Sequence, residues 1–456
     1  MAGIGFALRN AQAGRGLVGA GVAGGHAVIV SAGPWLFAIL AIGLISWTGR
    51  AFRGADLIAD FRVATIYAFS VSLVLTAPVA TVAMRLVADA LFSRNYAEVG
   101  NYFIAALVIA TAVNVPAAIL IFAVAFDLEA GYATAAIVCS TSGGLVWVAA
   151  AFCGTIRQYG RVTLSFLAGF GFSFVACVFM SARGFGATEM VCALAGGLSL
   201  TFLLLASAIL RAFPGVGDWN RSTSVILSRH HILGLAGLAG AASVWIDKWV
   251  FWAERGEQAR IGLWHSPLYD GAMFIGCLAI IPALASFVMN FELVLFQNVR
   301  RYLGAVLSHR TLGVIEAARQ DLERNALRAL NDVILLQVGV SAVLVIAAPA
   351  VAELVGLQYA QVAILRMGFI GASFQFVFFA SSAIVAFCDR RLAFLVLQLT
   401  FLTTNLGLTL LFMRLGSSFD GMGYLLAAVS SGVIAYCTAV RVLTDLNFLL
   451  FVRGNR

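Results

Sequence analysis

Long apolar segments recur along this chain, and they constrain its fold more than any other feature. A transmembrane helix needs about 20 largely apolar residues, and twelve segments meet that length. Of the 456 residues, 62% are hydrophobic and 11% are charged, whereas soluble domains carry about 25% charged residues. The sequence therefore predicts an all-α polytopic membrane protein. The predicted spans are residues 17–47, 63–84, 102–126, 131–154, 162–182, 190–210, 231–253, 267–290, 332–352, 362–388, 392–413 and 421–440.

The basic residues are distributed unevenly between alternate connections. Connections on the side of the N-terminus collect 20 arginines, and those on the opposite side collect seven. Because basic loops remain in the cytoplasm, both termini are predicted to be cytoplasmic. No soluble module gathers the net charge of +8, so the charge indicates membrane topology and not nucleic-acid binding.

The gap between the sixth and seventh spans, residues 213–230, has the composition of a linker. It contains proline, glycine, asparagine and serine residues that favour turns. The linker divides the chain into an N-terminal six-helix lobe, residues 1–212, and a C-terminal six-helix lobe, residues 231–456. A basic connection follows the second span of each half, which indicates an internal repeat. Two six-helix lobes around a central cleft form a transporter architecture, although composition alone does not separate it from other twelve-span folds.

Sequence motifs of catalysis and cofactor binding are absent. There is no phosphate-binding loop, no HExxH and no CxxC, and the five histidines do not form a metal-ligand cluster. The seven cysteines lie in apolar stretches without paired or zinc-type spacing. We therefore expect no enzyme activity, no metal and no cofactor.

Ionisable residues inside spans are costly and mark candidate functional sites. The first six predicted spans contain no Asp, Glu, Lys or Arg, so His26 is a possible proton site there, with a structural histidine as the alternative. In the second half, Asp247, Lys248, Asp270 and Arg366 are expected at one depth. They form a candidate charged network at the periplasmic mouth, in which Lys248 pairs first with Asp270 and Arg366 second with Asp247. Snorkelling toward the interface is the alternative.

Tryptophans form a stripe around Lys248. Trp245, Lys248, Trp249 and Trp252 are spaced i, i+3, i+4 and i+7, which places them on one face of a helix. Aromatic faces stack on sugar rings, so the stripe suits a path for a neutral glycan. An aromatic belt at the membrane interface is the alternative.

Uncharged polar residues lie near the middle of three predicted spans. They are Asn114, Gln375 and Asn405. Such side chains could line a path for a hydroxyl-rich substrate, because they offer donors and acceptors without strong charge. Hydrogen bonding between helices would use the same residues.

Gly33 and Pro34 interrupt the first predicted span within the sequence SAGPW. Such a break permits the bending that alternating access requires, so these residues form a candidate hinge. A static kink is the alternative.

A helix-forming stretch, residues 299–330, connects the eighth and ninth spans. Its apolar residues are interspersed with arginines and carboxylates. This pattern could dock a cytoplasmic partner or extend the two spans into the cytoplasm, and extension is the interpretation that we favour.

Three local sequences resemble one known family. The opening MAGIGFALRN, the SAGPW of Ser31 to Trp35 and the WIDKWVFW of Trp245 to Trp252, together with the twelve-span layout, are similar to the PelG family of Pel exopolysaccharide transporters. That family belongs to the polysaccharide branch of the multidrug/oligosaccharidyl-lipid/polysaccharide (MOP) superfamily. The resemblance implies a bacterial inner-membrane transporter of an N-acetylgalactosamine-rich polymer in biofilm matrix synthesis. It also implies a cytoplasmic glycosyltransferase and two other inner-membrane components as partners.

The sequence therefore predicts a polysaccharide transporter that carries out no covalent catalysis. Two alternatives remain open. A lipid-linked oligosaccharide flippase would need a basic cavity of headgroup size, and a non-conducting scaffold would activate the glycosyltransferase without moving polymer.

Overall fold

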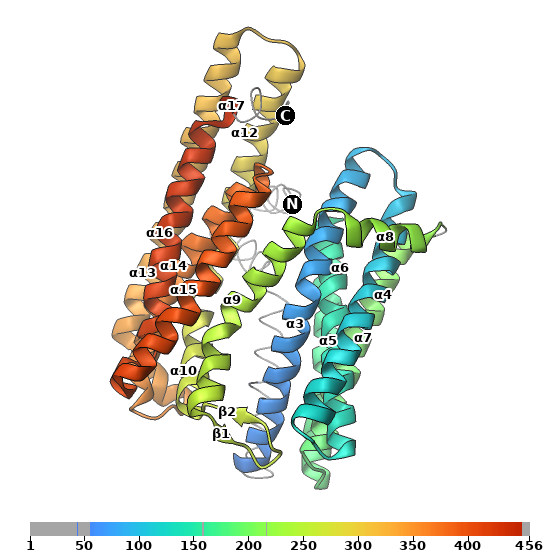
Figure 1. Cartoon of the computed structure of the whole chain (residues 1–456), viewed down its shortest axis with the longest axis vertical. Helices are drawn as coiled ribbons and strands as arrows, with labels where there is room; N and C mark the ends of the chain where they lie inside the picture. The colour runs from blue at the N-terminus through green and yellow to red at the C-terminus, as the bar shows by residue number, and fades with distance from the viewer. Residues whose placement is uncertain (1–42, 44–54, 157–158, 216, 449–456) are drawn as a thin grey trace, which may run out of the picture. The chain divides into compact units, whose positions relative to one another are not determined.

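The computed structural model describes residues 43, 55–156, 159–215 and 217–448, and nearly all of them are helical (Figure 1). The helices of the first half are α3 (Ala55–Phe92), α4 (Ala97–Ile119), the π-helical η1 (Leu120–Ala125), α5 (Ala130–Thr155), α6 (Tyr159–Arg183), α7 (Ala187–Ala212) and α8 (Trp219–Ser228). Those of the second half are α9 (His231–Arg255), α10 (Pro267–Leu278), α11 (Ile281–Ser286), the π-helical η2 (Phe287–Phe291), α12 (Glu292–Leu307), α13 (Leu312–Val355), α14 (Gln361–Phe387), α15 (Arg391–Leu415), the 3-10 turn η3 (Ser417–Phe419), α16 (Met422–Thr444) and α17 (Leu446–Phe448).

Helices long enough to span a membrane make up most of the described chain. Ten of them are sufficiently long and apolar, and the bent pair α8 and α9 is an eleventh candidate. Eleven of the twelve predicted spans coincide with these helices, so the expectation of an all-α polytopic membrane protein is confirmed. The first predicted span, residues 17–47, lies outside the described residues except for Gly43.

The described helices form two compact units. The N-terminal unit contains α3 to α8, α9 up to Trp245, and residues Phe251–Ser266. The C-terminal unit contains Ile246–Val250 of α9 and the helices from Pro267 onward. Because α9 contributes to both units, the assignment of residues 231–456 to a single lobe stays a prediction.

The same order of helix packing occurs inside each unit. In the N-terminal unit, α3 packs on α4 and α5, α4 packs on α5, and α7 packs on both α5 and α6. In the C-terminal unit, α10 packs on α14, α12 packs on α13, α13 packs on α14, and α16 packs on both α14 and α15. This parallel order is the pattern that an internal repeat of six spans produces.

Glycines bring neighbouring helices into backbone contact. A Cβ atom on Gly276 of α10 would lie 2.8 Å from the Cα atom of Gly368 on α14. A Cβ atom on Gly197 of α7 would overlap the backbone oxygen of Gly169 on α6. Close packing through small residues replaces the hydrophobic effect as a cause of helix association in lipid. The high glycine content of the sequence is therefore used at helix interfaces.

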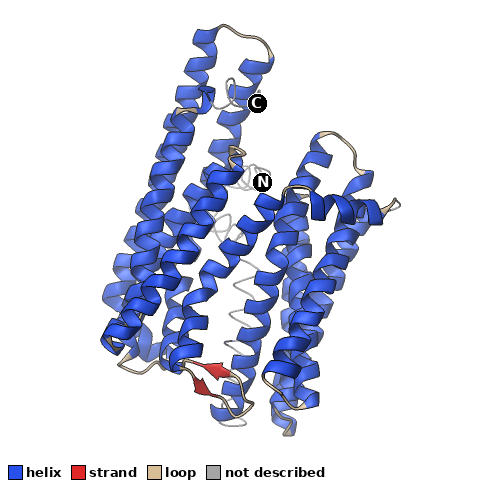
Figure 2. Ribbon diagram, viewed as in Figure 1, coloured by secondary structure: helices blue, strands red, loops and turns tan. Residues whose placement is uncertain are grey.

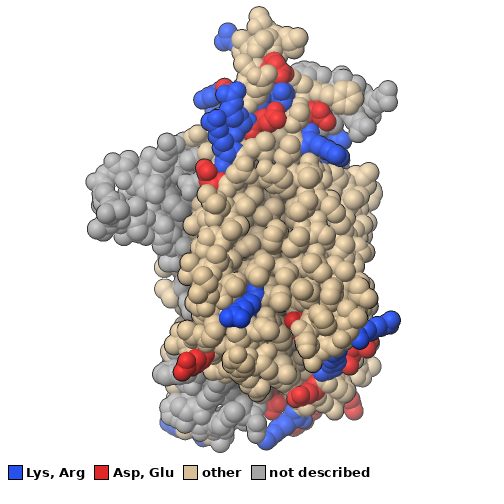
Figure 3. Space-filling model, turned by 90° about the vertical axis from the view of Figure 1, so that its left-hand side faces the viewer, with Lys and Arg blue, Asp and Glu red and all other residues tan. Residues whose placement is uncertain are grey.

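Charged side chains gather at the helix ends. In the face drawn in Figure 3, blue and red residues cluster toward the two ends, and a broad, nearly uncharged surface separates them. Leu335, Val343 and Ile346 of α13 are among the large apolar residues exposed on the C-terminal unit. This distribution is the one that a hydrocarbon layer around the middle of the helices requires.

A short β-hairpin interrupts the helical fold between α9 and α10 (Figure 2). Its strands β1 (Glu257–Gln258) and β2 (Trp264–His265) pair antiparallel. The hydroxyl of Tyr67 on α3 donates to the backbone oxygen of Trp264 at 2.8 Å. The hairpin is thereby held against α3 within the N-terminal unit.

Candidate functional site

Two neighbouring charged residues of α9 are buried together in the C-terminal unit. Asp247 is fully buried, and Lys248 is 9% exposed. The Lys248 Nζ atom donates to both carboxylate oxygens of Asp247, at 3.1 Å to Oδ1 and 3.0 Å to Oδ2. Successive side chains on a helix point about 100° apart, so the long lysine side chain must bend toward its neighbour to form this pair.

Other helices supply further donors to the same carboxylate. The hydroxyl of Tyr269 on α10 donates to Asp247 Oδ2 at 2.7 Å, and the Nδ2 atom of Asn405 on α15 lies 3.5 Å from Oδ1. Asn405 is itself fully buried and accepts a hydrogen bond from Thr409 at 3.3 Å. A carboxylate out of contact with water needs such donors, because its burial is otherwise very unfavourable.

An aromatic residue lies beside the ammonium group. The Lys248 Nζ atom is 5.7 Å from the centroid of the Tyr424 ring, which α16 contributes. The Tyr424 hydroxyl donates to Gln375 Oε1 on α14 at 2.6 Å, and Cys277 Sγ on α10 lies 4.0 Å from the same hydroxyl. Gly371 makes room for this ring, because a Cβ atom there would overlap it. The site thus joins side chains from α9, α10, α14, α15 and α16.

Asp247 and Lys248 neutralise each other at the centre of this arrangement. The negative carboxylate and the positive ammonium are adjacent, and the remaining polar partners are hydroxyl and amide groups. Asp270 on α10 is half-buried and close enough to Lys248 for an electrostatic interaction. Loss of Lys248 would leave the buried Asp247 carboxylate without the ammonium that binds both of its oxygens. The pair therefore fixes the central part of α9 to its neighbours in the C-terminal unit.

The predicted pairing of Arg366 with Asp247 is wrong. Arg366 is exposed on α14, and its Nε atom donates to the backbone oxygen of Val345 on α13 at 3.3 Å. The carboxylate of Asp247 is already bonded by Lys248, Tyr269 and Asn405. Of the four predicted charges, the structure therefore places Asp247, Lys248 and Asp270 together and Arg366 apart from Asp247.

The tryptophan stripe is divided between the two units. Trp252 is 5% exposed and stacks on Tyr67 in the N-terminal unit, with ring centroids 4.4 Å apart. Trp249 lies with Lys248 in the segment Ile246–Val250 of α9, which belongs to the C-terminal unit, and Trp245 belongs to the N-terminal unit. The Nε1 atom of Trp245 is buried and has no hydrogen-bond partner among the described residues. A role in sugar binding stays a prediction for all three tryptophans.

Asn114 lies between helices of the N-terminal unit. It is 1% exposed on α4, and its Oδ1 atom accepts a hydrogen bond from Ser140 on α5 at 3.1 Å. Its Nδ2 atom faces Gly144 and has no hydrogen-bond partner among the described residues. The amides of Gln375 and Asn405, by contrast, both join the polar network around Asp247 and Lys248.

The N-terminal unit contains a buried acid that the predicted span boundaries excluded. Helix α3 begins before the predicted span at residue 63, and Asp60 in its second turn is 8% exposed. The candidate membrane segment of this helix starts at Ala59 and so includes Asp60 and Arg62. The expected absence of charge therefore holds for the central part of this helix and not for its end. His26 and the candidate hinge at Gly33 and Pro34 lie outside the described residues.

Sequence reasoning missed the two tyrosines of the site. Tyr269 immediately precedes Asp270 near the start of a predicted span, and Tyr424 is the fourth residue of the last predicted span. A hydroxyl near a charged residue was the available signal for Tyr269. Nothing in the spacing of Tyr424 indicated that its ring would lie beside Lys248, because the two residues are far apart in the chain.

Comparison with known families gives one match over nearly the whole chain. The family model described as PelG, putative exopolysaccharide exporter (EPS-E), matches residues 1–451. A search of curated proteins found no match.

Solved transporter structures resemble the fold. A MATE crystal structure in complex with MaL6 has a TM-score of 0.65 at 16% identity and covers 92% of this chain and 96% of its own. An inward-facing MATE multidrug resistance transporter of the MOP superfamily has a TM-score of 0.61 at 17% identity, and the match covers 92% of this chain and 99% of that transporter. A MOP superfamily transporter from Pyrococcus furiosus has a TM-score of 0.58 at 16% identity, and the match covers 92% of this chain and 94% of that transporter. These likenesses establish a MATE-type fold.

Proposed function

The chain belongs to the PelG family of putative exopolysaccharide exporters, and from this premise we propose that it moves Pel-type polysaccharide across the bacterial cytoplasmic membrane. The protein is a multi-pass membrane protein with a transporter fold of the MOP superfamily. The proposed substrate is an N-acetylgalactosamine-rich polymer of the biofilm matrix. The observation that carries the proposal is the family match over residues 1–451.

The chemistry of the buried polar groups supports a neutral substrate. Asp247 and Lys248 compensate each other, and apart from the nearby Asp270 carboxylate the surrounding polar groups are hydroxyls and amides. A sugar polymer without charge needs donors and acceptors of this kind and no counter-charge. A phosphate-linked lipid, in contrast, is bound best by exposed arginines, whose guanidinium groups donate two parallel hydrogen bonds to a phosphate. A passage lined by groups of this kind would favour the polymer over a lipid-linked oligosaccharide.

The proposed complex includes partners on the cytoplasmic side. A cytoplasmic glycosyltransferase would make the polymer, and two further inner-membrane components would complete the assembly. Both termini of the chain would lie in the cytoplasm, and the excess of arginines in alternate connections supports this orientation.

Deletion of the gene in its own bacterium tests this function. We expect extracellular N-acetylgalactosamine polymer to disappear, while membranes from the same cells still synthesise polymer from the nucleotide sugar. Lectin staining of intact cells and a synthesis assay on isolated membranes measure the two quantities. Restoration by the plasmid-borne gene is the control.

The two readouts separate transport from activation. Loss of synthesis together with loss of extracellular polymer would support the scaffold and contradict the transport proposal. Unchanged extracellular polymer would exclude both roles.

A further inference from the structure

Helices α12 and α13 form a hairpin whose tip is apolar and exposed. We define the hairpin tip as residues Arg300–Val314, which contain the end of α12, the turn and the start of α13. Four large apolar side chains are exposed there: Leu303 at 40%, Leu307 at 77%, Leu312 at 77% and Val314 at 49%. Leucines exposed to this degree are ordinary in lipid and unfavourable in water.

All the charged residues of the hairpin tip are basic. It contains Arg300, Arg301 and Arg310 and has no aspartate or glutamate. All three arginines are exposed, and the described residues provide no ion-pair partner for them. The tip therefore presents leucines together with uncompensated positive charge.

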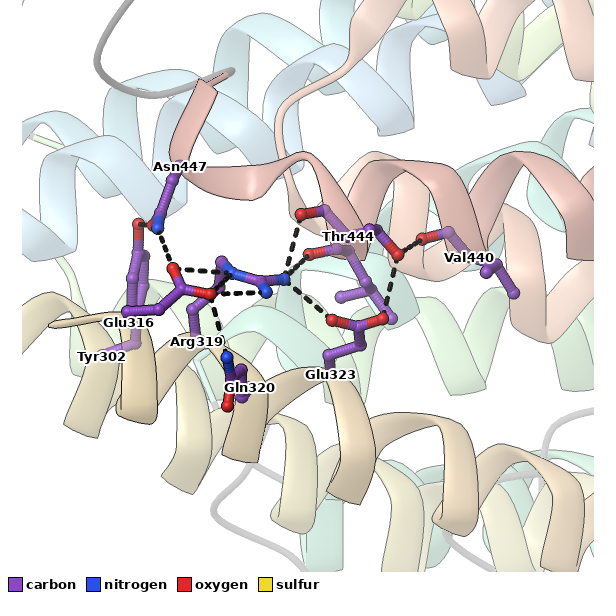
Figure 4. Close-up of polar contacts among 9 residues, drawn as sticks. Tyr302, Glu316, Arg319, Gln320, Glu323, Val440, Thr444 and Asn447 are labelled. Atoms are coloured by element: carbon purple, nitrogen blue, oxygen red, sulfur yellow. Dashed lines mark hydrogen bonds and ion pairs between the residues drawn. The ribbon is translucent and has the colours of Figure 1, made fainter. Parts of the chain in front are cut away.

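The stem behind the hairpin tip is held rigidly (Figure 4). Arg319 of α13 binds Glu316 at 2.7 Å and Glu323 at 2.8 Å, and its guanidinium also donates to the backbone oxygen of Thr444 at 2.9 Å. Asn447 donates to Glu316 at 2.6 Å and accepts from Tyr302 of α12 at 2.6 Å. These contacts join α12, α13, α16 and α17. A surface held in this way loses little conformational entropy when it binds a partner.

The hairpin tip extends past the neighbouring helix. Thr444, the last residue of α16, donates to Glu323 of α13 at 2.9 Å, so these two residues lie at one level. The start of α13, at Leu312, is eleven residues farther along the helix, which corresponds to about 16 Å at 1.5 Å per residue. Figure 1 shows the hairpin projecting beyond α14, α15 and α16. The exposed leucines of the tip thus lie beyond the end of α16.

We propose that the hairpin tip docks a water-soluble protein whose contact surface is acidic around an apolar centre. Apolar anchors surrounded by charge are typical of protein interfaces. A second copy of this chain would bring two basic tips together. The chain's own undescribed ends are unsuitable for the same reason, since residues 1–42, 44–54 and 449–456 contain no acidic residue. The projection of the tip past the end of α16 favours a soluble partner over a lipid surface. This inference does not depend on which substrate the protein moves.

Cysteine accessibility in native membranes tests the docking surface. The probe is a membrane-impermeant maleimide applied to inverted vesicles from matrix-producing cells that carry Leu312→Cys, with the exposed Cys192 and Cys437 replaced by serine. We expect Leu312→Cys to be labelled about tenfold more slowly before a wash in 1 M salt than after it. The labelling rate is proportional to the fraction of molecules whose tip is free, and a partner bound to about nine-tenths of the molecules leaves about one-tenth of the tips free. High salt screens charge beyond about 3 Å and should release the partner.

Charge reversal and a matched position make the test specific. Arg300→Glu, Arg301→Glu and Arg310→Glu together should abolish the slow labelling of Leu312→Cys without a salt wash. Asn95→Cys, in the equivalent connection between α3 and α4, is the control. The maleimide should label this cysteine at the same rate before and after the wash. The material released by the salt wash should restore slow labelling of Leu312→Cys when it is added back to washed vesicles. The same material should lose this effect after protease treatment.

Three results would overturn the proposal. Equal labelling of Leu312→Cys before and after salt would show that nothing covers the tip. Protection that persists in the purified protein in lipid vesicles would assign the cover to lipid or to this chain. Protection that rises with the concentration of purified protein would assign it to a second copy.

Discussion

Replacement of Lys248 with methionine is expected to destabilise the protein by about 4 kcal/mol, the typical cost of leaving one buried charge without its partner. Methionine preserves most of the volume of the lysine side chain, so the loss reports charge and hydrogen bonding more than packing. Asp247 would retain Tyr269 and Asn405 as donors and lose the ammonium that binds both of its oxygens. The apparent melting temperature of the detergent-purified protein, followed by loss of the monodisperse chromatographic peak, measures the effect.

A double substitution separates the pair from its surroundings. Asp247→Asn alone should also destabilise, because it removes the carboxylate that accepts two hydrogen bonds from the Lys248 ammonium. Asp247→Asn combined with Lys248→Met should recover most of the lost stability, since it removes both charges and keeps an acceptor for Tyr269. If the two single losses simply add in the double variant, the residues do not act as a buried ion pair.

Gly197→Ala is expected to destabilise the N-terminal unit by about 3 kcal/mol, because it forces one extra carbon into a closely packed helix interface. The new methyl group would overlap the side-chain oxygen of Ser173 and the backbone oxygen of Gly169 on α6, and it would lie 3.1 Å from Ser173 Cβ. Helices α6 and α7 must separate to accommodate it. The same thermal assay measures the loss.

Gly171→Ala is the matched control for this substitution. Gly171 lies two residues from Gly169 on the same helix, and a Cβ atom there would have no neighbour within 4 Å. Alanine has the higher helix propensity, so we expect this variant to be at least as stable as the natural protein. Equal losses for Gly197→Ala and Gly171→Ala would mean that close contact between α6 and α7 is not what Gly197 provides.

The helices were predictable because lipid imposes a length and a polarity on each of them. Eleven predicted spans coincide with described helices, and the long stretch 299–330 extends two of them, as α12 and α13 show. The breaks within the eighth span were not predictable in the same way. Pro282 marks the start of α11, but hydropathy over twenty residues does not register the π-helical turn that follows it.

The partners of the charged residues were harder to predict than their depth. Residues adjacent in a helix ordinarily face different directions, so the sequence favoured Asp270 over Asp247 as the partner of Lys248. The flexible lysine side chain also reaches Asp247, because Tyr269 and Asn405 hold that carboxylate in place, while Asp270 stays close enough to interact with Lys248 electrostatically. Arg366 was placed near Asp247 by depth alone, and depth does not determine which side of α14 faces the site.

Polymer movement by the purified assembly tests the central claim most directly. Vesicles containing this chain, the cytoplasmic glycosyltransferase and the other membrane components would receive nucleotide sugar on the outside, and a polymer-degrading hydrolase would then be added there. We predict that newly made polymer accumulates in a hydrolase-resistant, lumenal fraction only when this chain is present. Complete digestion of the polymer, despite active synthesis and correctly inserted protein, would contradict a transport function.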